Sequence, residues 1–289
     1  MSPESSHNPF WDLIIIVALI VFLWFGWVAM GGPAKFRAKE EGLLINPLST
    51  DSSAKSSSGA SSGSTQAKQD AEASPYAPLI SLRMNAAGTS PEKEYIELVV
   101  SSAAKNPITL TGWTLSSGSS IQAVIGQGTS ILSQGMQPYT EPIVLIPGAH
   151  AHIVTGRSPV GTSFQTNICS GYLEEYQSFT PSITKRCPSG TKTATAAGAS
   201  LDASCKKTLG SFSQCTTKGN LSSATSPQCV GFIREYMSYN GCVRVYKNTP
   251  AFSDGTWYVY LERISPLWPK KGTLILKDID GKIVKEIKY

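Results

Sequence analysis

The sequence has little of the material from which catalytic and metal sites are usually built. It contains only three histidines, His7, His150 and His152, in 289 residues. It has no His-Glu-x-x-His motif, no Cys-x-x-Cys pair and no phosphate-binding Gly-rich loop. The signatures of zinc proteases, zinc fingers, thioredoxin-type redox proteins and P-loop nucleotide hydrolases are therefore absent. We expect no catalytic residue, no cofactor and no enzymatic activity.

Basic residues are absent from the first 34 positions, and a long apolar run lies among them. Leu13–Met30 is eighteen residues without a charge, close to the about 20 that a helix needs to cross the hydrocarbon core. A cleaved signal peptide would need a positive first region, a shorter apolar stretch and a small-residue cleavage site, and Val28-Ala-Met30 is a poor site. The pattern predicts an N-terminal flank at 1–12 and an uncleaved transmembrane anchor at 13–32.

Two signals disagree about the side of the membrane on which the rest of the chain lies. Lys35, Arg37 and Lys39 come after the apolar run, and the positive-inside rule then places the C-terminal bulk in the cytoplasm. All six cysteines come after the run, and disulfides belong to oxidising compartments. Because long domains are translocated largely regardless of flanking charge, we expect a single-pass membrane protein with an extracytoplasmic C-terminal bulk.

Large apolar side chains are missing from much of the segment at 33–75. Ser56–Thr65, for example, consists only of Ser, Gly, Ala and Thr. Such a stretch cannot bury enough surface to offset its ordering entropy, so we expect a flexible tether. About thirty residues of this kind have an r.m.s. reach of about 30 Å, enough to hold a domain clear of a membrane.

Short segments of alternating apolar and polar residues come after the linker. Bounded by turn residues, they favour an all-β sandwich over residues 76–289. Asp280-Gly281, between two apolar segments, is the strongest local hairpin signal in the chain. The expected strands are Leu79–Met84, Glu94–Ser101, Ile108–Ser116, Ile143–Pro147, His150–Thr155, Trp257–Leu261, Thr273–Lys277 and Ile283–Lys288.

Three of these segments, in this order, carry a family resemblance. They are Glu94-Tyr-Ile-Glu-Leu98, Leu110-Thr-Gly-Trp-Thr-Leu115 and the final hairpin Leu274-Ile-Leu-Lys-Asp-Ile-Asp-Gly-Lys-Ile-Val284. Together they resemble the lamin-tail domain, an immunoglobulin-like β-sandwich found in nuclear lamins and in many exported bacterial proteins. With Gly31-Gly-Pro33 after the apolar run, the whole arrangement is similar to bacterial membrane-anchored lamin-tail proteins.

The resemblance implies a domain plan and a class of role. The sandwich would comprise 76–160 and 251–289, and the inserted segment at 161–250 is one that a minimal lamin-tail domain lacks. The family implies interaction rather than catalysis. Trp113 is the expected centre of the core, because one indole buries on the order of 200 Å²; stacking on a ligand is the alternative. Gly112 would permit the close approach of a facing strand, and Trp257 is expected in the same core.

The inserted segment holds all six cysteines. An even number in a weakly apolar segment favours two or three disulfides, with 15 possible connectivities for six cysteines; a metal site and free thiols are the alternatives. The spacing does not choose among the pairings. The cysteines are Cys169, Cys187, Cys205, Cys215, Cys229 and Cys242.

Two parts of the insertion have helical character, Tyr172–Phe179 and Gln228–Tyr239. In the second, Cys229, Phe232, Ile233 and Tyr236 share one face at helical spacing and would pack a small core. Gly190–Ala203 is small and polar, and we do not expect it to hold itself together.

Few residues suggest chemistry. His150 and His152 alternate along a strand and so project from one face, where a third ligand such as Glu141 would complete a zinc or copper site; an exposed sheet face is the simpler interpretation. Carboxylate pairs occur as well, and Asp278 with Asp280 could bind calcium, although Asp is usual in turns. A glycosidase needs two facing carboxylates across a cleft, which none of these pairs suggests. The other pairs are Glu94 with Glu97 and Glu174 with Glu175.

Charge and architecture together suggest a role. Residues 76–289 carry 20 Lys and Arg against 13 Asp and Glu, a net charge of +7, which suits anionic partners; a merely solvated basic surface is the alternative. We expect a membrane-anchored interaction or adhesion module whose insertion is the recognition surface, because ordered excursions from a rigid sandwich usually carry function. The alternatives are binding of an anionic polymer, such as DNA or acidic surface polysaccharide, and a cell-envelope hydrolase or its accessory. Candidate contacts are Tyr172, Tyr176, Phe179, Tyr236, Tyr239, Lys206 and Lys207.

Overall fold

The structure, a computed structural model, describes residues 19, 21, 73–86, 90–117, 121–132, 139–217, 221, 225–268 and 271–289. The predicted flank at 1–12 and nearly all of the predicted anchor and linker lie outside these residues. Within the described ranges, no helix has the length and apolar character needed to cross a membrane. The chain divides into two compact units, 1–60 and 61–289, and every sheet belongs to the second.

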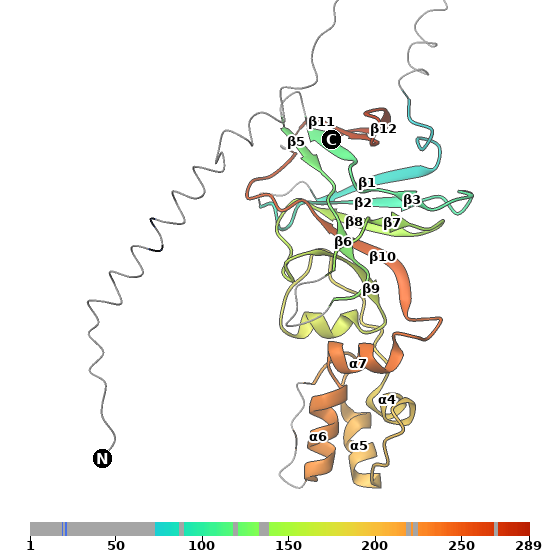
Figure 1. Ribbon diagram of the computed structural model, residues 1–289, viewed down its shortest axis with the longest axis vertical. Helices are drawn as coiled ribbons and strands as arrows, with labels where there is room; N and C mark the ends of the chain where they lie inside the picture. Colours follow the sequence, from blue (N-terminus) through green and yellow to red (C-terminus); the bar gives the residue numbers. More distant parts are fainter. Residues whose placement is uncertain are drawn as a thin grey trace, which may run out of the picture. The chain divides into compact units, whose positions relative to one another are not determined.

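The fold is mostly β-sheet, with three sheets and a group of short helices (Figure 1). The large sheet has the strand order β1-β2-β8-β10-β9-β6. Its neighbours are antiparallel, except that β8 with β10 and β6 with β9 are parallel. The strands are β1 (Ile80–Ala86), β2 (Tyr95–Val100), β6 (Gly128–Thr129), β8 (His150–Val154), β9 (Ser163–Asn167) and β10 (Ser253–Tyr260).

The small sheet joins strands from before and after the insertion. Its order is β12-β11-β4-β5, all antiparallel, and Leu276 of β11 lies opposite Leu115 of β4. The third sheet is the short pair β3 and β7. The bounds are β3 (Ile108–Thr109), β4 (Thr114–Ser117), β5 (Ile121–Val124), β7 (Val144–Leu145), β11 (Thr273–Lys277) and β12 (Ile283–Lys288).

One hydrophobic core contains buried residues of both larger sheets, and we call these two sheets with their shared core the sandwich. Burial alternates along β2 and β11, as a strand with one covered face requires. Trp113 and Trp257 are both in this core, with 1% and 3% of their surface exposed. Trp268, which the sequence analysis did not single out, is as deeply buried as Trp113.

Gly112 is needed for a turn. Its φ of +89° lies in the left-handed region that favours glycine, and its N–H donates to the carbonyl of Ile125 at 2.8 Å. A Cβ at this position would also lie 3.0 Å from Cδ1 of Ile279. The expectation that Gly112 admits a facing strand was therefore wrong in its reason, because backbone conformation and one side chain set the requirement.

The hairpin predicted at Asp280-Gly281 joins β11 to β12. The Gly281 N–H donates to the carbonyl of Asp278 at 3.0 Å, and Gly281 has a φ of +76°. The Asp278 N–H donates to the carbonyl of Lys282 at 2.9 Å. A tight turn followed by a left-handed glycine is a common three-residue hairpin.

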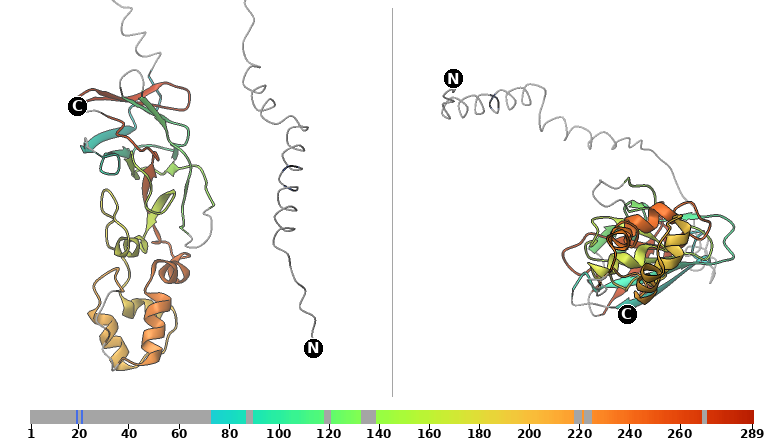
Figure 2. Two further views of the ribbon diagram at one scale, coloured as in Figure 1. Left: turned by 90° about the vertical axis from the view of Figure 1, so that its left-hand side faces the viewer. Right: turned by 90° about the horizontal axis from the view of Figure 1, so that it is seen from below.

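The insertion leaves the large sheet and returns to it at one place. Asn167 at the end of β9 lies opposite Ser253 at the start of β10, and the Ile168 N–H donates to the Phe252 carbonyl at 2.9 Å. The predicted boundary at 161 was therefore wrong, because it assigned β9 to the insertion. Figure 2 shows the insertion helices grouped together beyond this end of β9 and β10.

The helices of the insertion begin at capping side chains. Ser189, Asp202, Ser226 and Ser238 each accept a hydrogen bond from the backbone N–H three residues later, which satisfies a donor left free in the first turn. The elements are the 3₁₀ helix η1 (Ser170–Glu175) and the α-helices α4 (Gly190–Ala196), α5 (Ala203–Ser211), α6 (Pro227–Tyr236) and α7 (Tyr239–Tyr246).

The expectation for Gly190–Ala203 was wrong, because this stretch contains α4 and leads into α5. Small residues suffice there: Ala194 and Leu201 pack in a cluster with Leu209 of α5. The predicted apolar face of α6 belongs to the same cluster, with Cys229, Phe232 and Ile233 buried and Tyr236 partly buried. The residues of α4 have little intrinsic preference for helix, so packing on the neighbouring helices and the Ser189 cap stabilise it.

All six cysteines form disulfides, as predicted, and the pairing that the spacing left open is now defined. Cys169–Cys242 and Cys187–Cys215 lie in a second hydrophobic cluster, which also contains Phe164 and Tyr258 of the large sheet. Cys205–Cys229 lies in the helical cluster and joins α5 to α6. Two bridges therefore fasten the base of the insertion beside the sheet, and one fastens its helices to each other.

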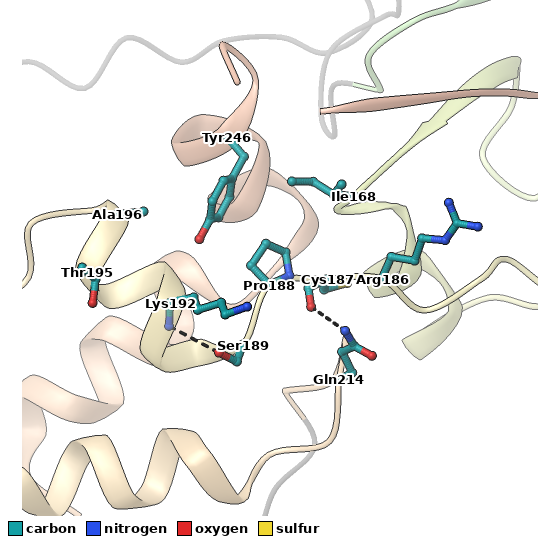
Figure 3. Close-up of a pocket in the computed structure, with 10 residues that line it drawn as sticks. All are labelled: Ile168, Arg186, Cys187, Pro188, Ser189, Lys192, Thr195, Ala196, Gln214 and Tyr246. Atoms are coloured by element: carbon teal, nitrogen blue, oxygen red, sulfur yellow. Dashed lines mark hydrogen bonds between the residues drawn. The ribbon is translucent and has the colours of Figure 1, made fainter. Parts of the chain in front are cut away.

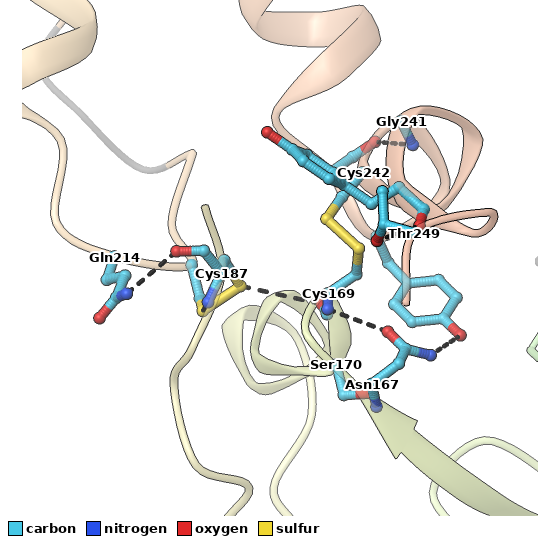
Figure 4. The surroundings of a disulfide bond; sticks show 12 residues. Asn167, Cys169, Ser170, Cys187, Gln214, Gly241, Cys242 and Thr249 are labelled. Carbon is cyan, nitrogen blue, oxygen red and sulfur yellow. Dashed lines mark hydrogen bonds between the residues drawn. A yellow bond between two sulfur atoms is a disulfide. The ribbon is translucent and has the colours of Figure 1, made fainter. Parts of the chain in front are cut away.

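The Cys169–Cys242 bridge is surrounded by polar contacts as well (Figure 4). The Cys169 N–H donates to Oδ1 of Asn167 at 2.9 Å, and Nδ2 of Asn167 donates to the Tyr239 hydroxyl at 3.2 Å. Asn167, the last residue of β9, is thus hydrogen-bonded to Cys169 at the start of η1 and to Tyr239, the first residue of α7. This part of the insertion is fixed to the sheet by covalent bonds, packing and hydrogen bonds together.

Candidate functional site

The outer face of the large sheet carries the two histidines. Glu97 of β2 and His152 of β8 are cross-strand partners, and Oε1 of Glu97 lies 3.2 Å from Nδ1 of His150. Tyr258 is the partner of His152 on β10, and the two rings are 5.1 Å apart. The histidines thus lie on one face, as predicted. The ring of His150 contacts the Glu97 carboxylate, whereas the ring of His152 lies beside that of Tyr258.

His152 is held as a packed side chain. Its ring contacts the rings of Tyr95 and Tyr258, and its buried Nδ1 has no hydrogen-bond partner among the described residues. Burial lowers the pKa of His152 below its usual value and outweighs the opposing effect of the Glu97 carboxylate. The neutral imidazole is the favoured form.

The metal site predicted as a possibility at these histidines does not assemble. Glu141, the suggested third ligand, accepts a hydrogen bond from the Ser130 N–H at 3.1 Å and bridges to Gly128 through its backbone. Within the described ranges, no group of three His, Cys, Asp or Glu side chains is close enough to hold a metal ion.

Three of the aromatic contact candidates are core residues. Tyr172, Phe179 and Tyr239 have only 4%, 5% and 2% of their surface exposed. Burial raises the pKa of Tyr172 to about 12, and it also raises that of Tyr239, whose hydroxyl accepts from the Leu132 N–H at 3.1 Å. Their assignment as ligand contacts was wrong, because the second cluster uses them to join the insertion to the sheet.

The remaining candidates lie at the surface of the insertion. Tyr176 is 71% exposed, with its hydroxyl 3.3 Å from that of Thr217. Tyr236 stacks on Phe232 and lies under the guanidinium of Arg244. Tyr176 borders a cavity of about 230 Å³, which is smaller than the roughly 300–1,000 Å³ of most ligand sites. The last two candidates, Lys206 and Lys207, are exposed on α5.

The carboxylate pairs act as hydrogen-bond acceptors. Glu94 is fully buried and accepts from the backbone N–H groups of Leu267 and Trp268 at 2.6 and 3.3 Å. Glu174 accepts from the Ile183 N–H at 2.7 Å, and Glu175 accepts from the Thr217 N–H at 2.8 Å. These contacts fix loops, so the carboxylates do not face one another across a cleft.

The Asp278 carboxylate has the same task in the final hairpin. Its Oδ1 accepts from the N–H groups of Asp280 and Lys282 at 3.0 and 2.9 Å. The side chain of Asp278 is buried, whereas Asp280 is exposed. The turn therefore does not bring the two carboxylates together in the way that a calcium site requires.

A cleft of about 700 Å³ lies among the described residues at the base of the insertion (Figure 3). We name it the α4–α7 cleft after the two helices that flank it. Lys192 reaches toward Pro188 from α4, and Tyr246 does so from α7. The lining residues are Ile168, Arg186, Cys187, Pro188, Ser189, Lys192, Thr195, Ala196, Gln214 and Tyr246.

The α4–α7 cleft combines an apolar lining with positive charge. Lys192 is exposed, and within the described ranges no carboxylate lies at ion-pair distance from it. Arg186 is also exposed, and Nη1 lies 3.9 Å from Oδ2 of Asp254, a long contact. Gln214 is held by donating to the Cys187 carbonyl at 3.0 Å. No acidic residue is among the ten that line the cleft.

Most residues of this cleft escaped the sequence analysis. Arg186 is one of the 20 basic residues counted in the net charge, but it was not singled out. Lys192 and Tyr246 lie 54 positions apart, and no local motif connects them. The Cys187–Cys215 bridge brings Gln214 beside Arg186 and Pro188. The disulfide pairing was therefore the missing information.

No family model, no curated protein and no solved structure matches the chain.

Proposed function

We propose that this protein is a non-catalytic, membrane-anchored interaction module of the lamin-tail type, with its C-terminal bulk outside the cytoplasm. An immunoglobulin-like sandwich is the support, and the disulfide-bonded insertion is the recognition part. The observation that carries the proposal is the construction of the insertion: three disulfides hold a helical unit that bears the α4–α7 cleft.

Three features support this role. Disulfides form and persist in oxidising compartments, and all six cysteines are paired. The segments that resemble a lamin tail form β2, β4 and the β11–β12 hairpin of the two larger sheets. The carboxylates that a hydrolase would use, Glu174 and Glu175 among them, hold backbone N–H groups instead.

Binding of an anionic polymer is the second candidate. The exposed Arg186 and Lys192 in the α4–α7 cleft favour it. The logarithm of the binding constant for a polyanion falls linearly with the logarithm of the salt concentration. The binding constant of an uncharged protein contact changes much less. A salt series with the purified full-length chain separates the two candidates.

The first test concerns location. Intact cells that make the full chain are treated with a membrane-impermeant thiol reagent, with and without a reductant, beside a lysed sample. We expect labelling of intact cells only after reduction, because all six cysteines are paired. Thiols that stay hidden until lysis and then react without reductant would place the domain in the cytoplasm and refute the proposal.

A further inference from the structure

The α4–α7 cleft has the size and polarity of a small-ligand site. Its volume of about 700 Å³ falls within the roughly 300–1,000 Å³ typical of such sites, which pair an apolar lining with a few placed polar groups. The apolar part is made by Ile168, Pro188 and the ring of Tyr246, and the polar part by the side chains of Ser189 and Gln214. Figure 3 shows these side chains around one space.

The charge of the cleft selects an anion. Among the ten described residues that line it, only Lys192 and Arg186 are charged. The Arg186 guanidinium lies 3.9 Å from the Asp254 carboxylate. Lys192 has no described carboxylate at ion-pair distance. A bound carboxylate or phosphate would therefore take Lys192 as its partner, since the Arg186 guanidinium is directed away from Lys192 (Figure 3). Hydrogen bonds between an ammonium and an anion are among the stronger polar contacts in proteins.

The shape and composition of the cleft disfavour nucleic acid and peptide. A nucleic-acid strand needs a basic groove that tracks its backbone over several nucleotides, but here there are two cations in a short cleft. The other lysines of the insertion, such as Lys206 and Lys207 on α5, do not line it. A peptide that binds by strand addition needs a sheet edge, and none of the ten lining residues lies in a strand.

We propose that the α4–α7 cleft binds an acidic saccharide, with a sugar ring lying on Tyr246 and its carboxylate held by Lys192. A sugar presents a C–H face that packs on an aromatic ring, and hydroxyls that bond to side chains such as Gln214 and Ser189. Gln214 is suited to this because its Nε2 is already held by the Cys187 carbonyl. The inference rests on the proposed function in taking the insertion as the recognition part.

The test uses two probes that differ only in charge. A galacturonic acid tetrasaccharide and its fully methyl-esterified form are titrated by calorimetry into the purified full-length chain in detergent. We expect the acid to bind and the ester to bind at least tenfold more weakly. Lys192→Gln should raise the Kd of the acid by about tenfold or more, as expected for loss of one charged hydrogen bond. Tyr246→Leu should weaken the acid and the ester alike, because it removes the packing surface.

Lys206→Gln is the matched control, since it removes the same charge from an exposed position outside the cleft. Circular dichroism verifies that each variant folds. Equal weakening by Lys206→Gln and Lys192→Gln would mean diffuse attraction and overturn the site. Equal binding of acid and ester, no binding of either, or Lys192-dependent binding of a single-stranded oligonucleotide without binding of the uronate would overturn the ligand class. The calorimetric assay does not depend on where the protein is located, so a failure to bind the uronate would leave the thiol-labelling result unchanged. Cytoplasmic thiols, in turn, would refute the proposed function but not the ligand of the cleft.

Discussion

Backbone N–H groups in the loops of this domain are satisfied repeatedly by acidic side chains. Glu94 is the deepest example, with no exposed surface and two N–H donors from the segment before β11. This carboxylate fixes the turn that places Trp268 in the core. A single polar side chain therefore positions one of the three tryptophans buried in the described core.

Replacement of Glu94 by Gln should destabilise the fold. The amide keeps the shape but loses the charge, and its NH₂ group cannot accept from the second backbone donor. We expect the free energy of unfolding to fall by about 2 kcal/mol, within the range for hydrogen bonds to charged groups. Denaturant titration measures it, with Glu92→Gln, an exposed position, as the control. An equal effect of both variants would contradict this account.

The pH dependence of stability should contain a contribution from His152. Its pKa is lowered in the folded state, so the unfolded chain binds the proton more readily. Stability from this group is complete above the ordinary histidine pKa of about 6.5 and is lost as pH falls toward the lower folded pKa. Unfolding free energies measured between pH 8 and pH 5 should fall more steeply for the natural protein than for His152→Phe. Parallel curves would show that protonation of His152 is not disfavoured by folding.

Trp113 offers a test of the core. Removal of a fully buried indole should lower the free energy of unfolding by about 3–5 kcal/mol, so Trp113→Ala should unfold at much lower denaturant concentration. Ile264→Ala, at a position that is 78% exposed, should change it by no more than about 0.5 kcal/mol. If Trp113→Ala were as mild as Ile264→Ala, the sandwich could not depend on this residue.

At the scale of elements, the insertion contains two parts that are stabilised differently. Its base shares the second cluster with Phe164 and Tyr258 of the large sheet, whereas α4, α5 and α6 pack mainly on one another. The Cys205–Cys229 bridge lies in the second part. The α4–α7 cleft lies where the two parts meet, since Ile168 and Arg186 belong to the base and Lys192 to α4.

Removal of the Cys205–Cys229 bridge should loosen one part selectively. In the double variant Cys205→Ser/Cys229→Ser, we expect amide exchange to rise in α4, α5 and α6 while β2 and β8 stay protected. The local loss should be about 2–4 kcal/mol, the usual contribution of a disulfide. Hydrogen exchange with mass spectrometry measures it. Equal deprotection of the sheets would mean that the helices and the sandwich unfold as one unit.

The predictability of the elements depended on their length and composition. Strands with several alternating apolar residues, such as β2 and β11, were predicted within one or two residues. β6 has only two residues, and β9 has one large apolar side chain, Phe164, so neither shows a period. α4 consists of Gly, Thr, Lys and Ala, and its helix depends on a cap and on neighbours distant in sequence.

The candidate site was less predictable than the fold, for a physical reason. The α4–α7 cleft takes residues from separate segments between 168 and 246, which the disulfide pairing and the packing of α4 on α7 bring together. The aromatic candidates were chosen for composition, which does not separate a cleft-lining residue such as Tyr246 from core residues such as Tyr172 and Tyr239. Burial made that distinction.

At the scale of the whole molecule, the chain leaves the sandwich after Asn167 and returns to it at Ser253. These two residues are cross-strand partners in β9 and β10. Replacing residues 168–252 by Asn-Gly should therefore leave a closed hairpin and a folded sandwich. The excision uncovers Phe164, Tyr258 and Tyr260, so we expect strong binding of the dye ANS and self-association. With Trp11, Trp24 and Trp27 replaced by Phe, the fluorescence of the three core tryptophans, Trp113, Trp257 and Trp268, should keep its buried character. Exposure of these core tryptophans to solvent would show instead that the sandwich requires the insertion.

The position of β10 in the large sheet has a consequence in time. β10 lies between β8 and β9, and β11 pairs with β4, so strands near the C-terminus complete sheets begun about 150 residues earlier. During synthesis, β8 and β9 are made before β10, the strand that lies between them in the sheet. The helices of the insertion, in contrast, pack on segments that are near them in the sequence. Because long-range pairing is slow and leaves strand edges open to aggregation, the order of folding should run from the insertion outward. The strands made first, β1 to β9, are therefore the part of the domain that is most exposed to aggregation before β10 is made.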